Sequence, residues 1–370
     1  FFDHHRRNDM SALILALIPF LFLSQEEALT HKSYDEFPIE AKWSLPEGKV
    51  DRVVVLLGGS GAYDMDLDLT AASKGGQTKI LWLKDVSDAL VSKGFATLRY
   101  NKRNYQLQKA IEKSRKAGKN LSSSLREHLE AFKKNPLKSF VEDAKSFATF
   151  ARERYPNAKI LFLGASEGTH VALFASHELG WISGVGLIGF YTQTLDIMTF
   201  EQTIYRDESY FYNMDKDNDG ALSKEELGKG GAVGFALLVR IKGFDINRDD
   251  RIRLSEYRAF RLWGKSTLGD LSDYVRQELS YPSMKSILSK AEYPVAFFQG
   301  MWDNQTPAYN TMEIDAINRL KWKKSTLKFR YFEKRGHILD PRKSYYDLTY
   351  SPIAPDSLEA VATDMTRWMK

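Results

Sequence analysis

Residues 164–168 read Gly164-Ala165-Ser166-Glu167-Gly168, a G-x-S-x-G pentapeptide placed where a strand is expected to turn into a helix. The apolar run at 160–163 has the length of a strand buried on both faces, and small and apolar residues at 171–175 indicate a closely packed helix. A turn this sharp strains the serine backbone and exposes its hydroxyl, and flanking glycines remove side chains that would collide. The stretch predicts a nucleophile at Ser166, with a chance match of a short pattern as the alternative.

Short apolar runs alternate with helical patterns along most of the chain. Strands are expected at residues 53–57, 95–98, 160–163, 185–188, 295–298 and 327–332. Helices are expected between them at residues 86–93, 140–154, 169–179 and 311–320. This alternation predicts an α/β fold with a mostly parallel sheet and helices on both faces. Two segments differ: 106–138 is charged and predicts exposed helices, and 192–290 is too long for a crossover and predicts an insertion.

The composition is that of a water-soluble globular protein large enough for one domain with an insertion, or for two domains. The chain has 370 residues, 43% of them hydrophobic and 27% charged, and a net charge of +5. Much of the basic excess lies within residues 102–145, which predicts a solvated helical face and no nucleic-acid partner. Cysteine is absent, which excludes disulfides, thiol catalysis and cysteine metal sites.

The N-terminal region indicates export. Residues 12–23 form an apolar block interrupted only by Pro19, with Arg6 and Arg7 ahead of it and polar residues after it. This is the size of a signal-peptide core and is too short for a spanning helix. Residues 1–30 are therefore predicted to be a signal peptide or an N-terminal anchor of a periplasmic or secreted protein. Any membrane association is expected only through this segment; a buried N-terminal helix is the alternative.

Residues 215–226 match the twelve-residue EF-hand loop at every position. A hard cation takes several oxygen ligands, and a tight loop supplies them from alternating residues. Gly220 permits the bend, and the loop predicts one Ca²⁺ bound by Asp215, Asp217, Asp219, the carbonyl of Ala221, Ser223 and Glu226. The alternative is a turn rich in Asp and Asn that binds no metal.

A second loop follows at residues 245–256 and predicts a weaker Ca²⁺ site. Its ligands would be Asp245, Asn247, Asp249, the carbonyl of Arg251 and Glu256. Asp250 stands where glycine is preferred, and Arg253 stands at position 9, which often binds through water. EF-hands usually pair through their position-8 residues, here Leu222 and Ile252. Calcium outside cells is plentiful, so a structural role is favoured over a regulatory one.

The nucleophile would need a base and an orienting acid from later strand ends, in the chain order Ser, Asp, His. Asp303 follows the strand expected at 295–298, and His337 follows the strand expected at 327–332. The other histidines lie near the N-terminus, in the basic segment or on the helix after Ser166. The sequence therefore predicts that Ser166, His337 and Asp303 act together as nucleophile, base and orienting acid.

An oxyanion formed at Ser166 would need fixed hydrogen-bond donors. The backbone N–H of Glu167, directly after the nucleophile, is one expected donor. The other is expected from the glycine-rich turn at residues 58–61, which reads G-G-S-G. The alternative is a turn that cradles a phosphate, but residues 58–61 come with neither a P-loop lysine nor a G-x-G-x-x-G spacing.

With these residues in view, the chain resembles the serine α/β-hydrolases, and within them a group of bacterial esterases. That group carries a G-S-G-P-x-D-R-D turn, an L-R-Y-D-K-R-G strand end and a G-H-S-E-G-G elbow. Residues 59–66 read G-S-G-A-Y-D-M-D here, residues 98–103 read L-R-Y-N-K-R, and residues 164–169 read G-A-S-E-G-T. The similarity covers about residues 50–190 and 290–345. It implies Ser166 as nucleophile, Asp303 and His337 as partners, Ser60 as the second oxyanion donor, and ester hydrolysis.

Four positions depart from the pattern of that group, namely Ala62, Asn101, Ala165 and Thr169. None removes a catalytic group, but Ala165 and Thr169 flank the nucleophile and leave substrate choice open. An EF-hand insertion is not usual for the group.

The sequence thus predicts an α/β-hydrolase core at residues 31–191 and 291–370, with an inserted helical cap at 192–290 that contains two EF-hand loops. The expected function is hydrolysis of a small-molecule carboxylic ester through an acyl-enzyme, with calcium bound in the cap. Two alternatives stay open. The same triad would serve a thioesterase or a peptidase, and the scaffold could be a catalytically silent, calcium-responsive binding protein.

Overall fold

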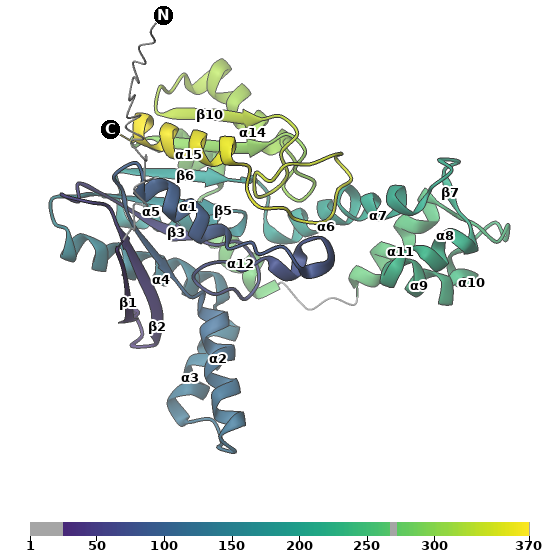
Figure 1. Cartoon of the computed structure of the whole chain (residues 1–370), viewed down its shortest axis with the longest axis horizontal. Helices are drawn as coiled ribbons and strands as arrows, with labels where there is room; N and C mark the ends of the chain where they lie inside the picture. Colours follow the sequence, from purple (N-terminus) through teal and green to yellow (C-terminus); the bar gives the residue numbers. More distant parts are fainter. Residues whose placement is uncertain (1–24, 267–271, 370) are drawn as a thin grey trace, which may run out of the picture.

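The computed structural model describes residues 25–266 and 272–369 and is built around one eight-stranded sheet (Figure 1). The strand order is β1-β2-β4-β3-β5-β6-β9-β10. The strands are β1 (Gln25–Lys32), β2 (Pro38–Leu45), β3 (Arg52–Leu57), β4 (Ala96–Tyr100), β5 (Lys159–Ala165), β6 (Gly184–Ile188), β9 (Val295–Gly300) and β10 (Leu327–Phe332). From β4 to β10 all neighbours pair in parallel, which confirms the six strands and the mostly parallel sheet expected from the sequence.

The first two strands form an antiparallel hairpin that the sequence analysis missed. β1 pairs with β2 over its whole length, from Gln25 opposite Leu45 to Lys32 opposite Pro38, and β2 pairs antiparallel with β4. The predicted leader boundary at residue 30 is therefore wrong, because residues 25–30 belong to the sheet. The apolar block at 12–23 lies outside the described residues. No helix within the described ranges combines the length and apolar character that a membrane crossing needs.

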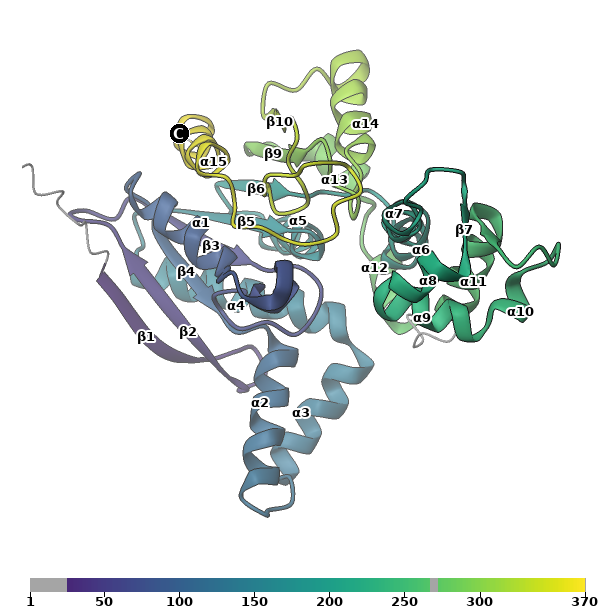
Figure 2. The same ribbon diagram turned by 45° about the vertical axis from the view of Figure 1, so that its right-hand side comes forward.

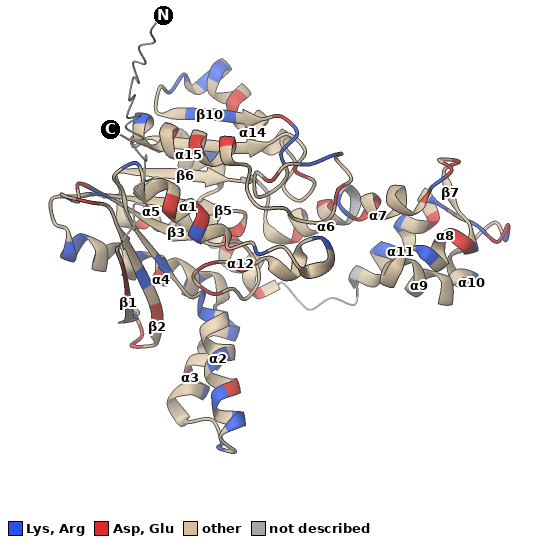
Figure 3. Cartoon of the chain, in the orientation of Figure 1, with Lys and Arg blue, Asp and Glu red and all other residues tan. Residues whose placement is uncertain are grey.

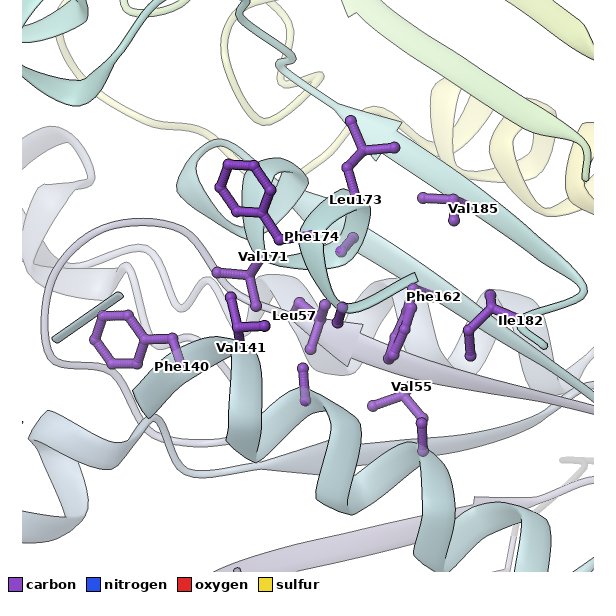
Figure 4. Close-up of a cluster of buried hydrophobic side chains, with 14 of the residues drawn as sticks. Val55, Leu57, Phe140, Val141, Phe162, Val171, Leu173, Phe174, Ile182 and Val185 are labelled. Carbon is purple, nitrogen blue, oxygen red and sulfur yellow. The ribbon is translucent and has the colours of Figure 1, made fainter. Parts of the chain in front are cut away.

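Side-chain alternation along the central strands builds a separate core on each face of the sheet. On β3, Val53, Val55 and Leu57 pack on one side, while Val54 and Leu56 pack on the other. The first side is covered by α4 (Pro136–Arg154), α5 (Glu167–Leu179), α13 (Met284–Lys290) and α14 (Tyr309–Ile317), and Figure 4 shows part of this core. The second side is covered by α1 (Trp82–Val91) and α15 (Pro355–Trp368). Each fully buried Val, Leu, Ile, Phe or Met side chain stabilises the fold by about 1.5–3 kcal/mol.

Two helices project from the body as an arm, α2 (Arg103–Lys116) and α3 (Ser123–Lys134) (Figure 2). α3 has no buried residue and α2 buries only Arg103 and Leu107, in agreement with the exposed helices expected there. Lys and Arg are frequent on α2 (Figure 3). The basic excess of the sequence is thus carried largely by a solvated surface.

The segment between β6 and β9 is helical and extends to one side of the sheet (Figures 1 and 2). It contains α6 (Leu195–Tyr205), α7 (Asp207–Met214), α8 (Lys224–Lys229), α9 (Gly231–Val239), α10 (Ile241–Phe244), α11 (Leu254–Ser266) and α12 (Ser272–Ser280). The outer part has its own small core, centred on Phe211, Leu222, Leu237, Ile252 and Tyr257. The returning helices α12 and α13 pack instead on the main core, through residues such as Tyr274 and Leu288.

Candidate active site

Ser166 lies at the carboxyl end of β5, directly before α5, in a strained backbone conformation. Its φ is 52° and its ψ is −123°, a backbone conformation that residues other than glycine rarely adopt. The two glycines of the pentapeptide are required by close backbone contacts. A Cβ atom on Gly164 would lie 2.2 Å from the Gly168 carbonyl oxygen, and one on Gly168 would lie 2.4 Å from the Leu57 carbonyl oxygen. The chain therefore forms the sharp strand-to-helix turn that the sequence predicts.

Hydrogen bonds hold the strained serine in place. Its N–H donates to the Ile188 carbonyl at 2.9 Å, and its carbonyl accepts from the N–H and the hydroxyl of Thr169 at 2.8 and 2.6 Å. Backbone strain of this kind costs of order 1 kcal/mol or more and is typical of functional sites.

We expect Ser166→Gly to raise the free energy of unfolding by about 1 kcal/mol, because glycine adopts a positive φ without the steric cost of a Cβ. The measurement is urea denaturation, with Ser166→Ala as the matched control, since alanine also lacks the hydroxyl but keeps the Cβ. If the glycine variant were no more stable than the alanine variant, Ser166 would not be strained.

Asp303 and His337 meet at the carboxyl ends of β9 and β10. His337 Nδ1 and Asp303 Oδ2 are 2.8 Å apart, and both side chains are buried. With the proton on Nδ1, the imidazole donates to the carboxylate, which leaves Nε2 as an acceptor. Burial raises the pKa of Asp303, but the adjacent His337 and the hydrogen bonds from His337 and Thr306 lower it by more, so this pKa lies below its ordinary value.

The loop after β9 fixes this carboxylate with donors that the sequence analysis did not name. Asp303 Oδ1 accepts from the N–H groups of Gln305 and Thr306 at 2.8 and 2.9 Å, and Oδ2 accepts from the Thr306 hydroxyl at 2.7 Å. Gln299 Nε2 lies 3.4 Å from Oδ2. The sequence from Asp303 to Thr306 could have indicated these donors, because an aspartate side chain readily accepts a hydrogen bond from the backbone N–H two residues later.

The end of β6 brings the imidazole close to the segment that holds the serine. A Cβ on Gly189 would lie 3.0 Å from His337 Cε1, and the preceding residue, Ile188, accepts from the Ser166 N–H. Within residues 25–266 and 272–369, no hydrogen bond joins the Ser166 hydroxyl to His337. Catalytic hydrogen bonds are often long in a free enzyme and tighten when substrate binds.

The glycine-rich turn lies directly against the serine. A Cβ on Gly59 would lie 3.1 Å from Ser166 Cβ, so any larger residue would be crowded at this position. The Ser60 side chain is exposed, and its N–H has no hydrogen-bond partner in the described part of the chain. Glu167 is the first residue of α5, where a backbone N–H has no partner within the helix. Two free N–H groups therefore flank the serine region from separate segments.

The first calcium loop has the geometry of an oxygen-rich cation site. Side-chain oxygens of Asp215, Asp217 and Asp219 lie within 4.8 Å of one another. Asp215 is buried, and its Oδ1 has no hydrogen-bond partner. Such an orphaned carboxylate oxygen is costly unless a cation pairs with it, so the residues fit Ca²⁺. Leu222 of β7 (Ala221–Leu222) pairs with Ile252 of β8 (Ile252–Arg253), as the sequence predicts.

In the second loop, residues 245–256, carboxylate oxygens of the predicted ligands accept hydrogen bonds from within the loop. Asp245 accepts from the N–H groups of Asp249 and Asp250, and Asp249 Oδ2 accepts from Asn247 and Arg253, each at 2.8 Å. Among the described residues, only the first loop brings three acidic, histidine or cysteine side chains together in this way.

The side chain of Arg251 reaches across from the second loop to the first. Its guanidinium pairs with Asp219 and lies 3.3 Å from the Ala221 carbonyl oxygen. The sequence predicted only the backbone carbonyl of Arg251 as a ligand, and the ion pair of its side chain with Asp219 was not predicted.

Comparison with known proteins adds to the fold. No family model matches the chain, and no curated protein matches its sequence. A puromycin-hydrolysing peptidase from Mycobacterium tuberculosis is similar in structure, with a TM-score of 0.51 and 14% identity, over 96% of this chain and 40% of that one. The chain has an α/β-hydrolase fold.

Two further solved structures are similar with lower TM-scores. The esterase domain of a Rhodothermus marinus protein has a TM-score of 0.47 and 12% identity, over 94% of this chain and 100% of that one. A Pyrococcus furiosus esterase has a TM-score of 0.48 and 12% identity, over 94% and 92%. At such identities the similarity concerns the fold, and the activity has to be argued from the site.

Proposed function

We propose that this protein is a serine hydrolase that cleaves small carboxylic esters through an acyl-enzyme on Ser166. The observation that carries the proposal is the buried Asp303–His337 hydrogen bond at 2.8 Å, formed at the same edge of the sheet as the strained serine. The carboxyl edge of a parallel sheet is where α/β folds place their ligands.

In the proposed mechanism His337 Nε2 accepts the hydroxyl proton as Ser166 Oγ attacks the ester carbonyl. Asp303 holds the imidazole in the required tautomer and stabilises its positive charge. The N–H groups of Glu167 and Ser60 bind the oxyanion of the tetrahedral intermediate. His337 then gives its proton to the departing alcohol. Water attacks the acyl-enzyme with the same groups in the same roles, which releases the carboxylic acid and restores Ser166.

The alternatives are tested by substrates that share one acyl group. We expect the wild-type protein to hydrolyse a para-nitrophenyl ester with a higher kcat/KM than the matched thioester or anilide. A thioester that is cleaved faster would make the protein a thioesterase, and a faster anilide or peptide would make it a peptidase. Failure with every substrate would favour a catalytically silent binding protein.

We further propose that the first loop binds one Ca²⁺ that stabilises the inserted segment. The ligands would be Asp215, Asp217, Asp219, the Ala221 carbonyl, Ser223 and Glu226. The buried, unpartnered Oδ1 of Asp215 supports this proposal. The second loop would bind more weakly, because Asp250 stands where an EF-hand loop prefers glycine. One proposed ligand in each loop, Asp219 or Asp249, also pairs with an arginine that would have to release it.

Adding calcium is expected to stabilise the protein by about 2.7 kcal/mol when its concentration is one hundred times the Kd of the site. The measurement is thermal unfolding with calcium or with chelator, and Asp215→Asn should remove most of the difference. Asp245→Asn in the second loop is the matched control and should remove less. A melting temperature that calcium does not change would contradict the site. A change in kcat/KM well below the melting temperature would indicate regulation.

A further inference from the structure

Lys102 connects the two segments that would supply the oxyanion donors. Its ammonium donates to the Gly59 carbonyl at 2.7 Å and pairs with the Glu167 carboxylate. The Lys102 and Glu167 side chains are only 13% and 6% exposed, so water screens the pair weakly. The lysine also lies over the Phe140 ring, 4.3 Å from its centroid. The proposed mechanism gives Lys102 no role.

The hydrogen bond to Gly59 controls the neighbouring N–H. The Gly59 carbonyl and the Ser60 N–H belong to one planar trans peptide and point in opposite directions. An ammonium that holds the carbonyl therefore also fixes the direction of the Ser60 N–H. A positively charged ammonium that donates to the carbonyl oxygen polarises the peptide and makes its N–H a stronger donor.

The ion pair of Lys102 with Glu167 acts on the charge beside the other donor. The Glu167 carboxylate belongs to the residue directly after the nucleophile, where an unpaired negative charge would oppose a developing oxyanion. Lys102 neutralises that charge and ties the start of α5 to the glycine turn. One ammonium thus fixes one proposed donor and neutralises the charge beside the other.

The strand end that carries Lys102 is itself fixed. The next residue, Arg103, is buried and bonds to Asp143 and Asp35 at 2.8 Å each. Asn104 Nδ2 donates to the Gly61 carbonyl at 3.0 Å, and the Lys102 N–H donates to the Tyr63 carbonyl at 3.1 Å. The segment after β4 therefore supports the glycine turn at several points, and Lys102 alone among these contacts also reaches Glu167.

We propose that Lys102 is a positioning residue that orients and polarises the Ser60 N–H and neutralises Glu167 for oxyanion binding. This inference rests on the proposed function. Because the oxyanion exists only in the transition state and the intermediate, loss of Lys102 should lower kcat and leave KM nearly unchanged.

The test compares three variants with the wild type on one para-nitrophenyl ester. Lys102→Met keeps the apolar stem over Phe140 and should lower kcat about 10- to 100-fold, less than the full loss of one oxyanion donor. Lys102→Gln supplies a neutral donor, so its kcat should lie between those of Lys102→Met and the wild type. Lys102→Arg keeps the charge and should have a kcat within about five-fold of the wild type. Lys109→Met, which removes an exposed partner of Glu40, is the matched control and should behave as wild type.

A second measurement does not depend on activity. A crystal structure of Lys102→Met, or of Lys102→Gln if the first variant does not fold, should show the Gly59–Ser60 peptide rotated from its wild-type orientation. Unchanged kcat together with an unchanged peptide would overturn the inference. A fall in kcat that the arginine variant does not restore would also overturn it. If the wild type hydrolyses no ester, the proposed function fails, and the peptide orientation alone decides the positioning role of Lys102.

Discussion

Replacing Ser166 with alanine is expected to lower kcat for a para-nitrophenyl ester by about 10⁶-fold, the loss typical of a catalytic serine. The variant keeps the fold, because alanine removes only the hydroxyl and leaves the backbone bonds to Ile188 and Thr169 in place. His337→Ala should cost nearly as much, and the double variant should be little worse than either, since the groups act as a unit. The rates are measured under substrate saturation.

Ser60→Ala is the matched control for this serine. The Ser60 side chain is exposed and only its N–H is assigned a role, so kcat should stay within about three-fold of wild type, as for an ordinary surface change. Residual activity of Ser166→Ala within a hundred-fold of wild type would mean that another residue, or water alone, attacks the ester.

Asp303→Asn is expected to lower kcat about 10⁴-fold with little change in KM. The asparagine amide can present its N–H group to His337 Nδ1, which then has to accept, and this favours the tautomer with its proton on Nε2. That tautomer cannot accept the proton of Ser166. The measurement is steady-state kinetics, with folding checked by circular dichroism.

Thr306→Val is a milder change at the same carboxylate, because it removes one hydrogen bond to Asp303 and keeps the carboxylate itself. It removes the hydroxyl that bonds to Asp303 at 2.7 Å and lies 3.1 Å from His337 Nδ1, while the backbone bond to Asp303 stays. We expect kcat to fall about ten-fold, as for other groups that orient a catalytic side chain. If Asp303→Asn cost no more than Thr306→Val, the carboxylate would not orient the base.

The central strands and the turn at Ser166 could be predicted because their signals are local. Residues 160–163 are continuously apolar, and both glycines of the pentapeptide avoid backbone collisions that any side chain would cause. In the β1–β2 hairpin, β2 alternates apolar and polar residues from Ile39 to Leu45, a local strand pattern that was overlooked, but β1 gave no such signal. β1 is an edge strand with the sequence QEEALTHK and no buried residue, so its composition does not distinguish it from a loop.

The order of strand ends allowed Asp303 and His337 to be predicted as partners, since parallel strands place their carboxyl ends together. Contacts between distant segments could not be predicted. The pair of Lys102 and Glu167 joins residues 65 positions apart, and nothing near either one indicates the other. The twelve-residue pattern at residues 215–226 is local as well, and its binding of calcium stays a prediction. The contact of the Arg251 guanidinium with Asp219 joins distant positions and could not be predicted.

The most direct test is covalent labelling with a fluorophosphonate, followed by mass spectrometry of the intact protein and its peptides. We expect one adduct per chain, located on Ser166, absent from Ser166→Ala and formed far more slowly by His337→Ala. An unlabelled wild-type protein, an adduct on another residue, or labelling of Ser166 at an unchanged rate in His337→Ala would contradict this expectation.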